Sequence, residues 1–161
     1  MTTLLALDIG GTKVGWGIVE AGDTYEVTER GSIPTDAMRG GADVAARICE
    51  LASSLVASHP SVSGVAVASA GVVNPATGDI VSATGTMPGW GGTRLGSLLE
   101  AATGLRVRVL NDVHAHGLGE ATLGAGQPYR TVLSIAVGTG IGGALVEDRQ
   151  VSFGSRGIAG H

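Results

Sequence analysis

Two turns rich in glycine and threonine are places where the backbone could bind an anion. The first, Gly10-Gly11-Thr12-Lys13, follows a short apolar run that ends at Asp8, and Lys13 is the only lysine in the chain. Glycine lets a phosphate approach backbone N–H groups without a Cβ in the way, and a threonine hydroxyl adds a donor. The turn is not a Walker A motif, and the second turn is not a Rossmann fingerprint, because it leads into a strand rather than a helix.

The second turn repeats the design of the first. The pattern of Gly11, Thr12, Gly15, Val19 and Glu20 recurs as Gly138, Thr139, Gly142, Val146 and Glu147. The repeat predicts two halves that hold one ligand between them. The alternative is that any two glycine-rich hairpins look alike. Together with Asp8 at the strand end before the first turn, the pair indicates a nucleoside triphosphate and Mg²⁺.

Asn111 and Asp112 lie between a predicted strand and a predicted helix. One interpretation is structural, because Asn and Asp are common helix N-caps. The other is chemical: a carboxylate at the end of a strand can take the proton of a hydroxyl that attacks a γ-phosphate. Both hold if Asn111 caps the helix or contacts substrate while Asp112 is the base. His114 and His116 follow, but they cannot share a helix face, which argues against a paired metal site.

The hydrophobic pattern predicts the elements that would position these residues. Strands are expected at 3–8, 14–20, 25–33, 64–73, 79–83 and 106–110, with a strand and a hairpin over 131–153. Helices are expected at 39–58, 93–103 and 112–123. This alternation is typical of the α/β class with a mixed sheet.

Composition narrows the function classes. The 161 residues correspond to one domain, or one and a piece of another. A formal net charge of −4 argues against a protein that binds nucleic acid or an anionic membrane by bulk charge. The single cysteine excludes a disulfide framework. No stretch reads as a signal peptide or a membrane span, so we expect a cytoplasmic location.

Six blocks of the sequence resemble the ROK family of sugar kinases and repressors. They are DIGGTK (8–13), GVVNPATGDIV (71–81), MPGW (87–90), LNDVHAHGLGE (110–120), VGTGIGG (137–143) and GIAGH (157–161). The resemblance implies an actin-like, ribonuclease H-like ATPase fold with two lobes. It would place 1–124 in the first lobe and 125–161 at the start of the second. It also implies transfer of phosphate from ATP to the 6-hydroxyl of a sugar, by a homodimer at full length.

The resemblance implies roles for individual residues. Asp112 would be the catalytic base, and the sugar would contact Gly71, Thr84, Asn111, Asp112 and His161. The ATP phosphates would meet the two turns at Asp8, Gly10, Gly11, Thr12, Lys13, Gly138, Thr139, Gly140, Gly142 and Gly143. We expect no metal site within the chain itself, with Mg²⁺ arriving on ATP near Asp8.

Two departures from the family pattern bear on the choice of sugar. ROK glucokinases usually have Asn where Thr86 stands and Glu where His161 stands. Bacterial N-acetylmannosamine kinases resemble this chain more closely, because their block GLAGHxGH corresponds to GIAGH at 157–161. A histidine can donate a hydrogen bond to a sugar oxygen, whereas a carboxylate can only accept. We therefore expect a hexose or N-acetylhexosamine, with N-acetylmannosamine preferred and glucose as the alternative.

The family also defines what is expected beyond His161. Its chains are about twice as long, and its cysteine-rich Zn²⁺ cluster and adenosine-binding helices would follow this residue. We expect a fragment that is inactive or weakly active alone, with structural Zn²⁺ only in the absent part. The competing hypotheses are a sugar-sensing ROK regulator and a non-catalytic relic. Such repressors carry a helix-turn-helix before the DIGGTK block, which begins here at residue 8.

Overall fold

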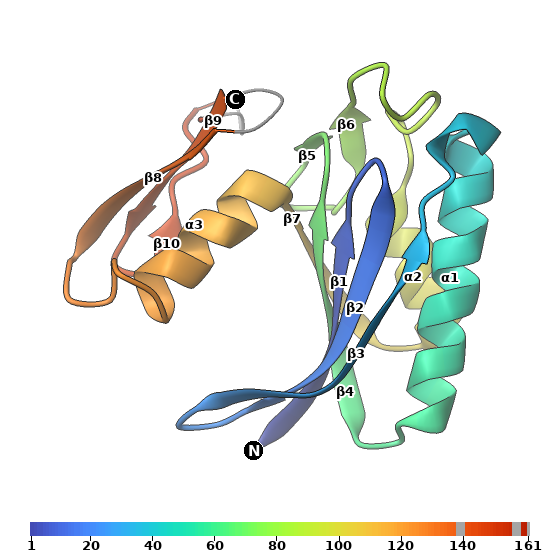
Figure 1. Ribbon diagram of the computed structural model, residues 1–161, viewed down its shortest axis with the longest axis horizontal. Coiled ribbons are helices and arrows are strands. Elements are labelled where there is room, and N and C mark those ends of the chain that lie inside the picture. Colours follow the sequence, from blue (N-terminus) through green and yellow to red (C-terminus); the bar gives the residue numbers. More distant parts are fainter. Residues whose placement is uncertain (138–140, 156–158, 161) are drawn as a thin grey trace. The chain divides into compact units, whose positions relative to one another are not determined.

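The chain forms two compact units in a computed structural model that describes residues 1–137, 141–155 and 159–160. The first unit is Met1–Leu110 and the second is Asn111–His161 (Figure 1). Each unit contains its own sheet and its own helical cover. The lobe boundary predicted at 124/125 stays a prediction.

The first unit is organised by a five-stranded sheet in the order β3-β2-β1-β4-β7. β1 pairs antiparallel with β2 and parallel with β4. β2 and β3 form an antiparallel hairpin. The five strands are β1 (Thr2–Ile9), β2 (Lys13–Ala21), β3 (Tyr25–Pro34), β4 (Val62–Ser69) and β7 (Arg106–Asn111).

Side chains alternate between the two faces of this sheet, as the period of a strand requires. In β1, Leu5, Leu7 and Ile9 are buried in the core, whereas Asp8 is exposed on the opposite face. Helices α1 (Gly41–Ser58) and α2 (Leu95–Thr103) contribute to the same core and lie on the same face of the sheet (Figure 1). The face that carries Asp8 is therefore the one opposite these two helices.

Two helix ends in the first unit differ in how they are formed. α1 starts after a short 3₁₀ turn, η1 (Ala37–Arg39), so the helix begins two residues later than the predicted 39–58. α2 ends at Gly104, which has φ of +69° and caps the helix by donating to the carbonyl of Glu100. That conformation is the left-handed one that glycine adopts without a steric penalty.

One predicted strand is divided in the structure. The run 64–73 was expected to be continuous, but it forms β4 and the separate short strand β5 (Val72–Val73). The chain turns at Gly71, where φ is +96° and an added Cβ would lie 2.7 Å from the carbonyl oxygen of Ser82. β5 then pairs antiparallel with β6 (Ile80–Ser82). The division brings Gly71 next to the segment that leads to Thr84.

The second unit is a three-stranded sheet with one helix packed against it. Its order is β10-β9-β8, with antiparallel pairing throughout. Helix α3 packs on β8 and β9 through Gly117, because an added Cβ there would lie 2.5 Å from the Cβ of Ala144. The elements are α3 (Asp112–Thr122), β8 (Thr131–Val137), β9 (Ile141–Glu147) and β10 (Gln150–Val151).

No helix in the part of the chain that the structure describes is both long enough and apolar enough to cross a bilayer.

Candidate functional site: two glycine-rich turns and a capped carboxylate

The first glycine-rich turn is a tight connection between β1 and β2. The strand pairing ends at Ile9 and Val14, and the Gly10 N–H donates to the carbonyl of Lys13 at 3.0 Å. Gly11, Thr12 and Lys13 are all exposed. The turn therefore presents a glycine backbone, a hydroxyl and an ammonium group to one region of solvent, which suits an anion.

A buried threonine supports this turn from behind. The Thr35 hydroxyl donates to the carbonyl of Gly10 at 2.6 Å, and the Thr35 N–H donates to the carbonyl of Thr12 at 3.0 Å. Thr35 is only 1% exposed. Arg47 of α1 in turn donates to the carbonyls of Thr35 and Pro34, both at 2.8 Å. The conformation of the turn is thus tied through Thr35 to the first helix.

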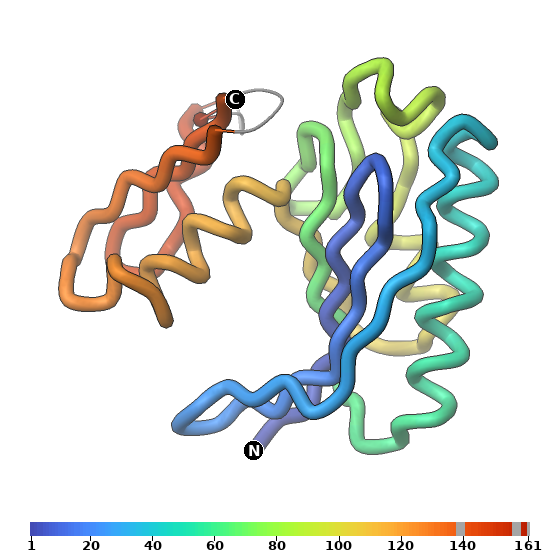
Figure 2. Tube along the Cα trace, in the orientation of Figure 1, coloured from blue at the N-terminus to red at the C-terminus, as the bar shows by residue number. Residues whose placement is uncertain are grey.

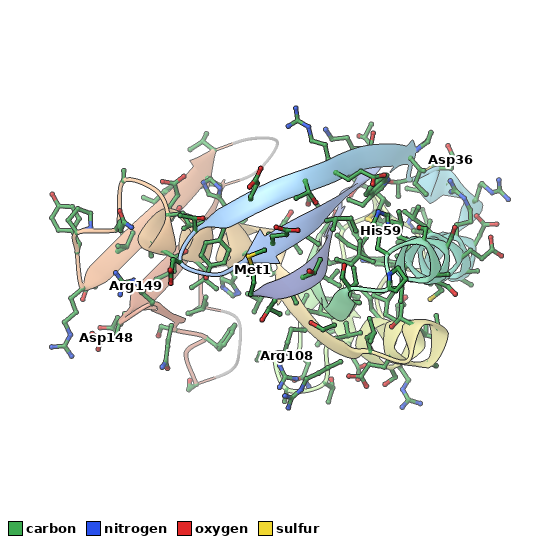
Figure 3. All side chains as sticks on the ribbon, turned by 90° about the horizontal axis from the view of Figure 1, so that it is seen from below. Met1, Asp36, His59, Arg108, Asp148 and Arg149 are labelled. Atoms are coloured by element: carbon green, nitrogen blue, oxygen red, sulfur yellow. The ribbon has the colours of Figure 1, made fainter. Side chains whose placement is uncertain are left out.

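Asp36, which follows Thr35, also contacts Arg47. It lies just beyond the end of β3 (Figure 3) and has φ of +50°, in the left-handed region. Its carboxylate lies 3.4 Å from the Arg47 guanidinium. This ion pair helps keep Arg47 over the Thr35 carbonyl.

Replacing Thr35 by Val should weaken both the fold and the first turn. The carbonyl of Gly10 would lose its donor, which costs about 1–3 kcal/mol for a buried group. We expect a lower free energy of unfolding in denaturant titration and a several-fold higher KM for ATP. The control is Thr28→Val, because the exposed Thr28 hydroxyl on β3 donates only to the carbonyl of Ile18. Loss of stability with an unchanged KM would mean that Thr35 serves the core alone.

Asp8 is placed on the open face of the sheet, one residue before the end of β1. Its strand neighbour is Gly15, where an added Cβ would lie 3.7 Å from the Cβ of Asp8. The missing side chain at Gly15 leaves room around the carboxylate. An exposed carboxylate close to a phosphate-binding turn is a suitable partner for Mg²⁺ and its water shell. No cluster of three or more acidic, histidine or cysteine side chains that could hold a metal occurs among the described residues.

The predicted sugar contacts of the first unit lie near that turn. Gly11 approaches the 84–87 segment, because an added Cβ would lie 3.9 Å from Met87 Cγ and 4.0 Å from Thr86 Cβ. Thr84 and Thr86 share a hydrogen bond of 2.7 Å between their hydroxyls. Figure 2 shows the β1–β2 turn and the loop that follows β6 at the same end of the sheet.

Trp90 fixes the end of this segment. Its indole N–H donates to the Ser69 hydroxyl at 3.3 Å and to the carbonyl of Ala70 at 3.2 Å, and the ring is fully buried. The segment with Thr84 and Thr86 is therefore anchored in the core beside Gly71.

In the second unit, Asn111 is the N-cap of α3. Its Oδ1 accepts from the N–H groups of Val113 at 2.9 Å and of His114 at 3.2 Å. This confirms the capping interpretation, whereas a sugar contact of Asn111 stays a prediction. The Asn111 amide also donates to Oδ1 of Asp112 at 2.8 Å.

Asp112 is therefore oriented by its neighbours. Its Oδ1 accepts from the Asn111 amide and from the Val113 N–H at 2.9 Å. Among the residues that the structure describes, no group donates to the other oxygen, Oδ2. A carboxylate with one oxygen anchored and the other open can receive a proton from a bound hydroxyl.

The start of β9 lies against the same end of α3. An added Cβ at Gly142 would lie 3.0 Å from Val113 Cγ2, next to Asp112. The structure thus places Gly142 beside the helix that carries the carboxylate, whereas an added Cβ at Gly143 would lie near the carbonyl of Ser134. Gly138, Thr139, Gly140 and His161 lie outside the described residues, so their predicted roles stay predictions.

Sequence reasoning missed two residues that organise these turns. Thr35 directly follows Pro34, which pairs with Lys13 in the β2–β3 hairpin. The hairpin register thus places Thr35 beside the turn, but β3 is exposed along almost its whole length and the ladder shifts register between Ile18 and Val19, so alternation alone does not give this register. His114 is buried and contacts the carbonyl of Ala159. Its partner lies 45 residues away, and no local pattern signals that contact.

The model of the ROK family matches residues 4–161. The chain belongs to the ROK family. A β-glucoside kinase from Listeria monocytogenes is 34% identical over 157 residues, which are 98% of this chain and 51% of that protein. The chain spans about half the length of the curated relatives it matches.

Solved structures agree with this assignment. A ROK family glucokinase from Streptomyces griseus, in complex with glucose and AMPPNP, matches with a TM-score of 0.83 and 28% identity over 98% of this chain and 48% of that one. A candidate N-acetylmannosamine kinase from Listeria monocytogenes matches with a TM-score of 0.83 and 32% identity over 99% of this chain and 52% of that one. The fold is therefore the predicted actin-like ATPase fold of ROK sugar kinases.

Not every structural match in the family is a kinase. A ROK family transcriptional regulator, a homologue of the Escherichia coli MLC protein, matches with a TM-score of 0.86 and 25% identity. The match covers 99% of this chain and 40% of the regulator. Membership in the ROK family therefore has to be combined with the site itself before a function is chosen.

Proposed function

We propose that this ROK chain carries the base and phosphate-binding turns of an ATP-dependent sugar kinase. The observation that carries the proposal is Asp112, whose Oδ1 is held by Asn111 and the Val113 N–H, while no described residue donates to its other oxygen. A regulator needs to bind a sugar but has no use for a carboxylate prepared to take a proton. Both turns of the repeat are also intact in the sequence.

The reaction follows from what each group can do. Asp112 takes the proton of the sugar 6-hydroxyl while that oxygen forms a bond to the γ-phosphorus of ATP. The bond between the γ-phosphorus and its bridging oxygen breaks, and ADP leaves with the electron pair. Such transfers depend on positioning and on stabilising negative charge, so the turns at 10–13 and 137–143 matter as much as the base.

ATP and Mg²⁺ are assigned to specific groups in this proposal. Backbone N–H groups of the two turns, with the Thr12 hydroxyl and Lys13, bind phosphate oxygens. Asp8 is assigned to the hydration shell of Mg²⁺, because it is exposed and has no side chain opposite it at Gly15. A kinase that uses ATP in this way is assigned to the cytoplasm.

The sugar is proposed to be a hexose or an N-acetylhexosamine, and N-acetylmannosamine is our preferred substrate. The argument rests on His161 and Thr86, which replace the Glu and Asn usual in ROK glucokinases. A hydroxyl at position 86 is shorter than an amide, and its hydrogen bond with Thr84 reduces its freedom to bind elsewhere. These changes leave more room and a different donor pattern than a glucose site has.

The test is ADP release from the complete reading frame, assayed with N-acetylmannosamine, N-acetylglucosamine, mannose, glucose and no sugar in parallel. Turnover with one N-acetyl sugar well above glucose is the expected result. Turnover with glucose alone would keep the kinase and remove the N-acetylhexosamine assignment. Sugar binding without turnover by folded protein would favour a regulator. The 161-residue chain assayed alone would show whether this part has activity of its own.

A further inference from the structure

A buried histidine joins α3 to the segment 153–160, which follows β10. His114 is only 2% exposed, and its Nε2 lies 2.7 Å from the carbonyl oxygen of Ala159. A carbonyl oxygen only accepts, so Nε2 is the protonated nitrogen and donates. His114 comes two residues after Asp112, in the first turn of the same helix. The contact therefore ties the helix end that carries the carboxylate to this segment.

The same imidazole contacts the other end of the segment. The His114 ring meets the Phe153 ring edge to face, with centroids 5.5 Å apart and an interplanar angle of 77°. The Ala159 N–H donates to the carbonyl of Phe153 at 3.1 Å, which closes the loop between the two residues. His114 thus contacts both Phe153 and Ala159.

The segment returns to the sheet at Gly160. The carbonyl of Gly160 accepts from the Gly143 N–H at 2.8 Å. Gly160 has φ of +94°, and an added Cβ would collide with the carbonyl oxygen of Gly143. Only glycine fits this position. Ala159 is therefore tied to α3 by His114, and Gly160 is tied to β9 by Gly143, which belongs to the second glycine-rich turn.

We propose that His114 is a positioning residue that sets Ala159 and Gly160 relative to the base Asp112. The inference rests on the proposed function, because the next residue, His161, is the predicted sugar contact. Loss of the Nε2 donor leaves the carbonyl of Ala159 without its partner and frees the segment from α3. The sugar would then be held less well, whereas the first phosphate turn does not depend on His114.

The kinetic test compares two substitutions at this position. His114→Phe keeps a planar ring against Phe153 but removes the donor, whereas Gln in His114→Gln can supply an N–H at a similar reach. For His114→Phe we expect the KM for the sugar to rise about tenfold, the scale of one lost buried hydrogen bond, with the KM for ATP within twofold. His114→Gln should restore most of the sugar KM. His116→Phe is the control, because His116 is exposed on the same helix.

A structural readout separates this inference from the proposed function. Amide exchange followed by NMR should speed up at Ala159 and Gly143 in His114→Phe and recover in His114→Gln. The amides of β8 that pair with β9 should not change. Unchanged exchange at Ala159 would overturn the inference, as would faster exchange with no change in sugar KM. If the unmodified enzyme turns over no sugar, the proposed function fails, while the exchange experiment still decides whether His114 holds the segment.

Discussion

Replacing Asp112 by Asn should abolish phosphoryl transfer while sugar affinity stays within a few-fold of the unmodified enzyme. An Asn side chain has nearly the same shape, and its oxygen can still accept from the Val113 N–H, as Asp112 does at 2.9 Å. The neutral amide of Asn, however, cannot take a proton from the sugar hydroxyl. A positioned general base contributes about 10²–10⁴ in rate, so kcat should fall by that order. The measurements are kcat by ADP release and the sugar Kd by calorimetry.

A second carboxylate of the same unit provides the control for Asp112. Asp148 forms an exposed ion pair with Arg130 at 2.9 Å. Asp148→Asn should therefore leave kcat unchanged and cost little stability. If sugar binding and turnover disappear together in Asp112→Asn, Asp112 is a ligand or a structural group rather than the base.

Replacing Gly11 by Ala should weaken ATP binding without disturbing the fold. An added Cβ at Gly11 has no neighbour closer than 3.9 Å, and its φ lies outside the left-handed region. In such a position Ala is tolerated and even stabilises slightly, by about 0.4–1 kcal/mol. The methyl group would instead occupy the space that a phosphate needs. We expect the KM for ATP to rise about tenfold or more, which corresponds to ~1.4 kcal/mol.

Measuring the free energy of unfolding separates an effect of Gly11→Ala on ATP binding from damage to the fold. Thermal or denaturant unfolding should show equal or slightly higher stability, so a change in ATP affinity cannot come from a damaged fold. Gly22→Ala is the matched control, because it lies in the β2–β3 turn with Met1 Cγ at 3.6 Å from an added Cβ. An unchanged KM for ATP in Gly11→Ala would show that the first turn is not a phosphate site.

Most of the fold could be predicted from the sequence, because apolar residues repeat with the period of each element. The exception is the run 64–73, where small and β-branched residues continue on both sides of Gly71, so the glycine is the only local sign of a break. Its division at Gly71 results from a contact with Ser82, which lies on another strand. Contacts of this kind depend on tertiary structure, and a periodicity argument cannot detect them.

In the candidate site, too, local features could be predicted from the sequence, whereas contacts between distant residues could not. Asn111 was predicted as a helix cap from its place before the helix, and the structure confirms this. Thr35 and His114 were not predicted as supports of the site, because Thr35 bonds to Gly10 25 residues away and His114 contacts Ala159 45 residues away. Residue types that could do chemistry were visible in the sequence, whereas the residues that hold them in position were not.

The two ends of the loop 153–159 are tied to one strand. The Ser152 N–H donates to the carbonyl of Leu145, and the Gly143 N–H donates to the carbonyl of Gly160, both at 2.8 Å. Because the entropy of closing a loop changes slowly with its length, we expect a change of length between Ser152 and Gly160 to leave β9 in place. In the kinase that we propose, a change in this loop would alter sugar preference and leave the base and the phosphate turn unchanged.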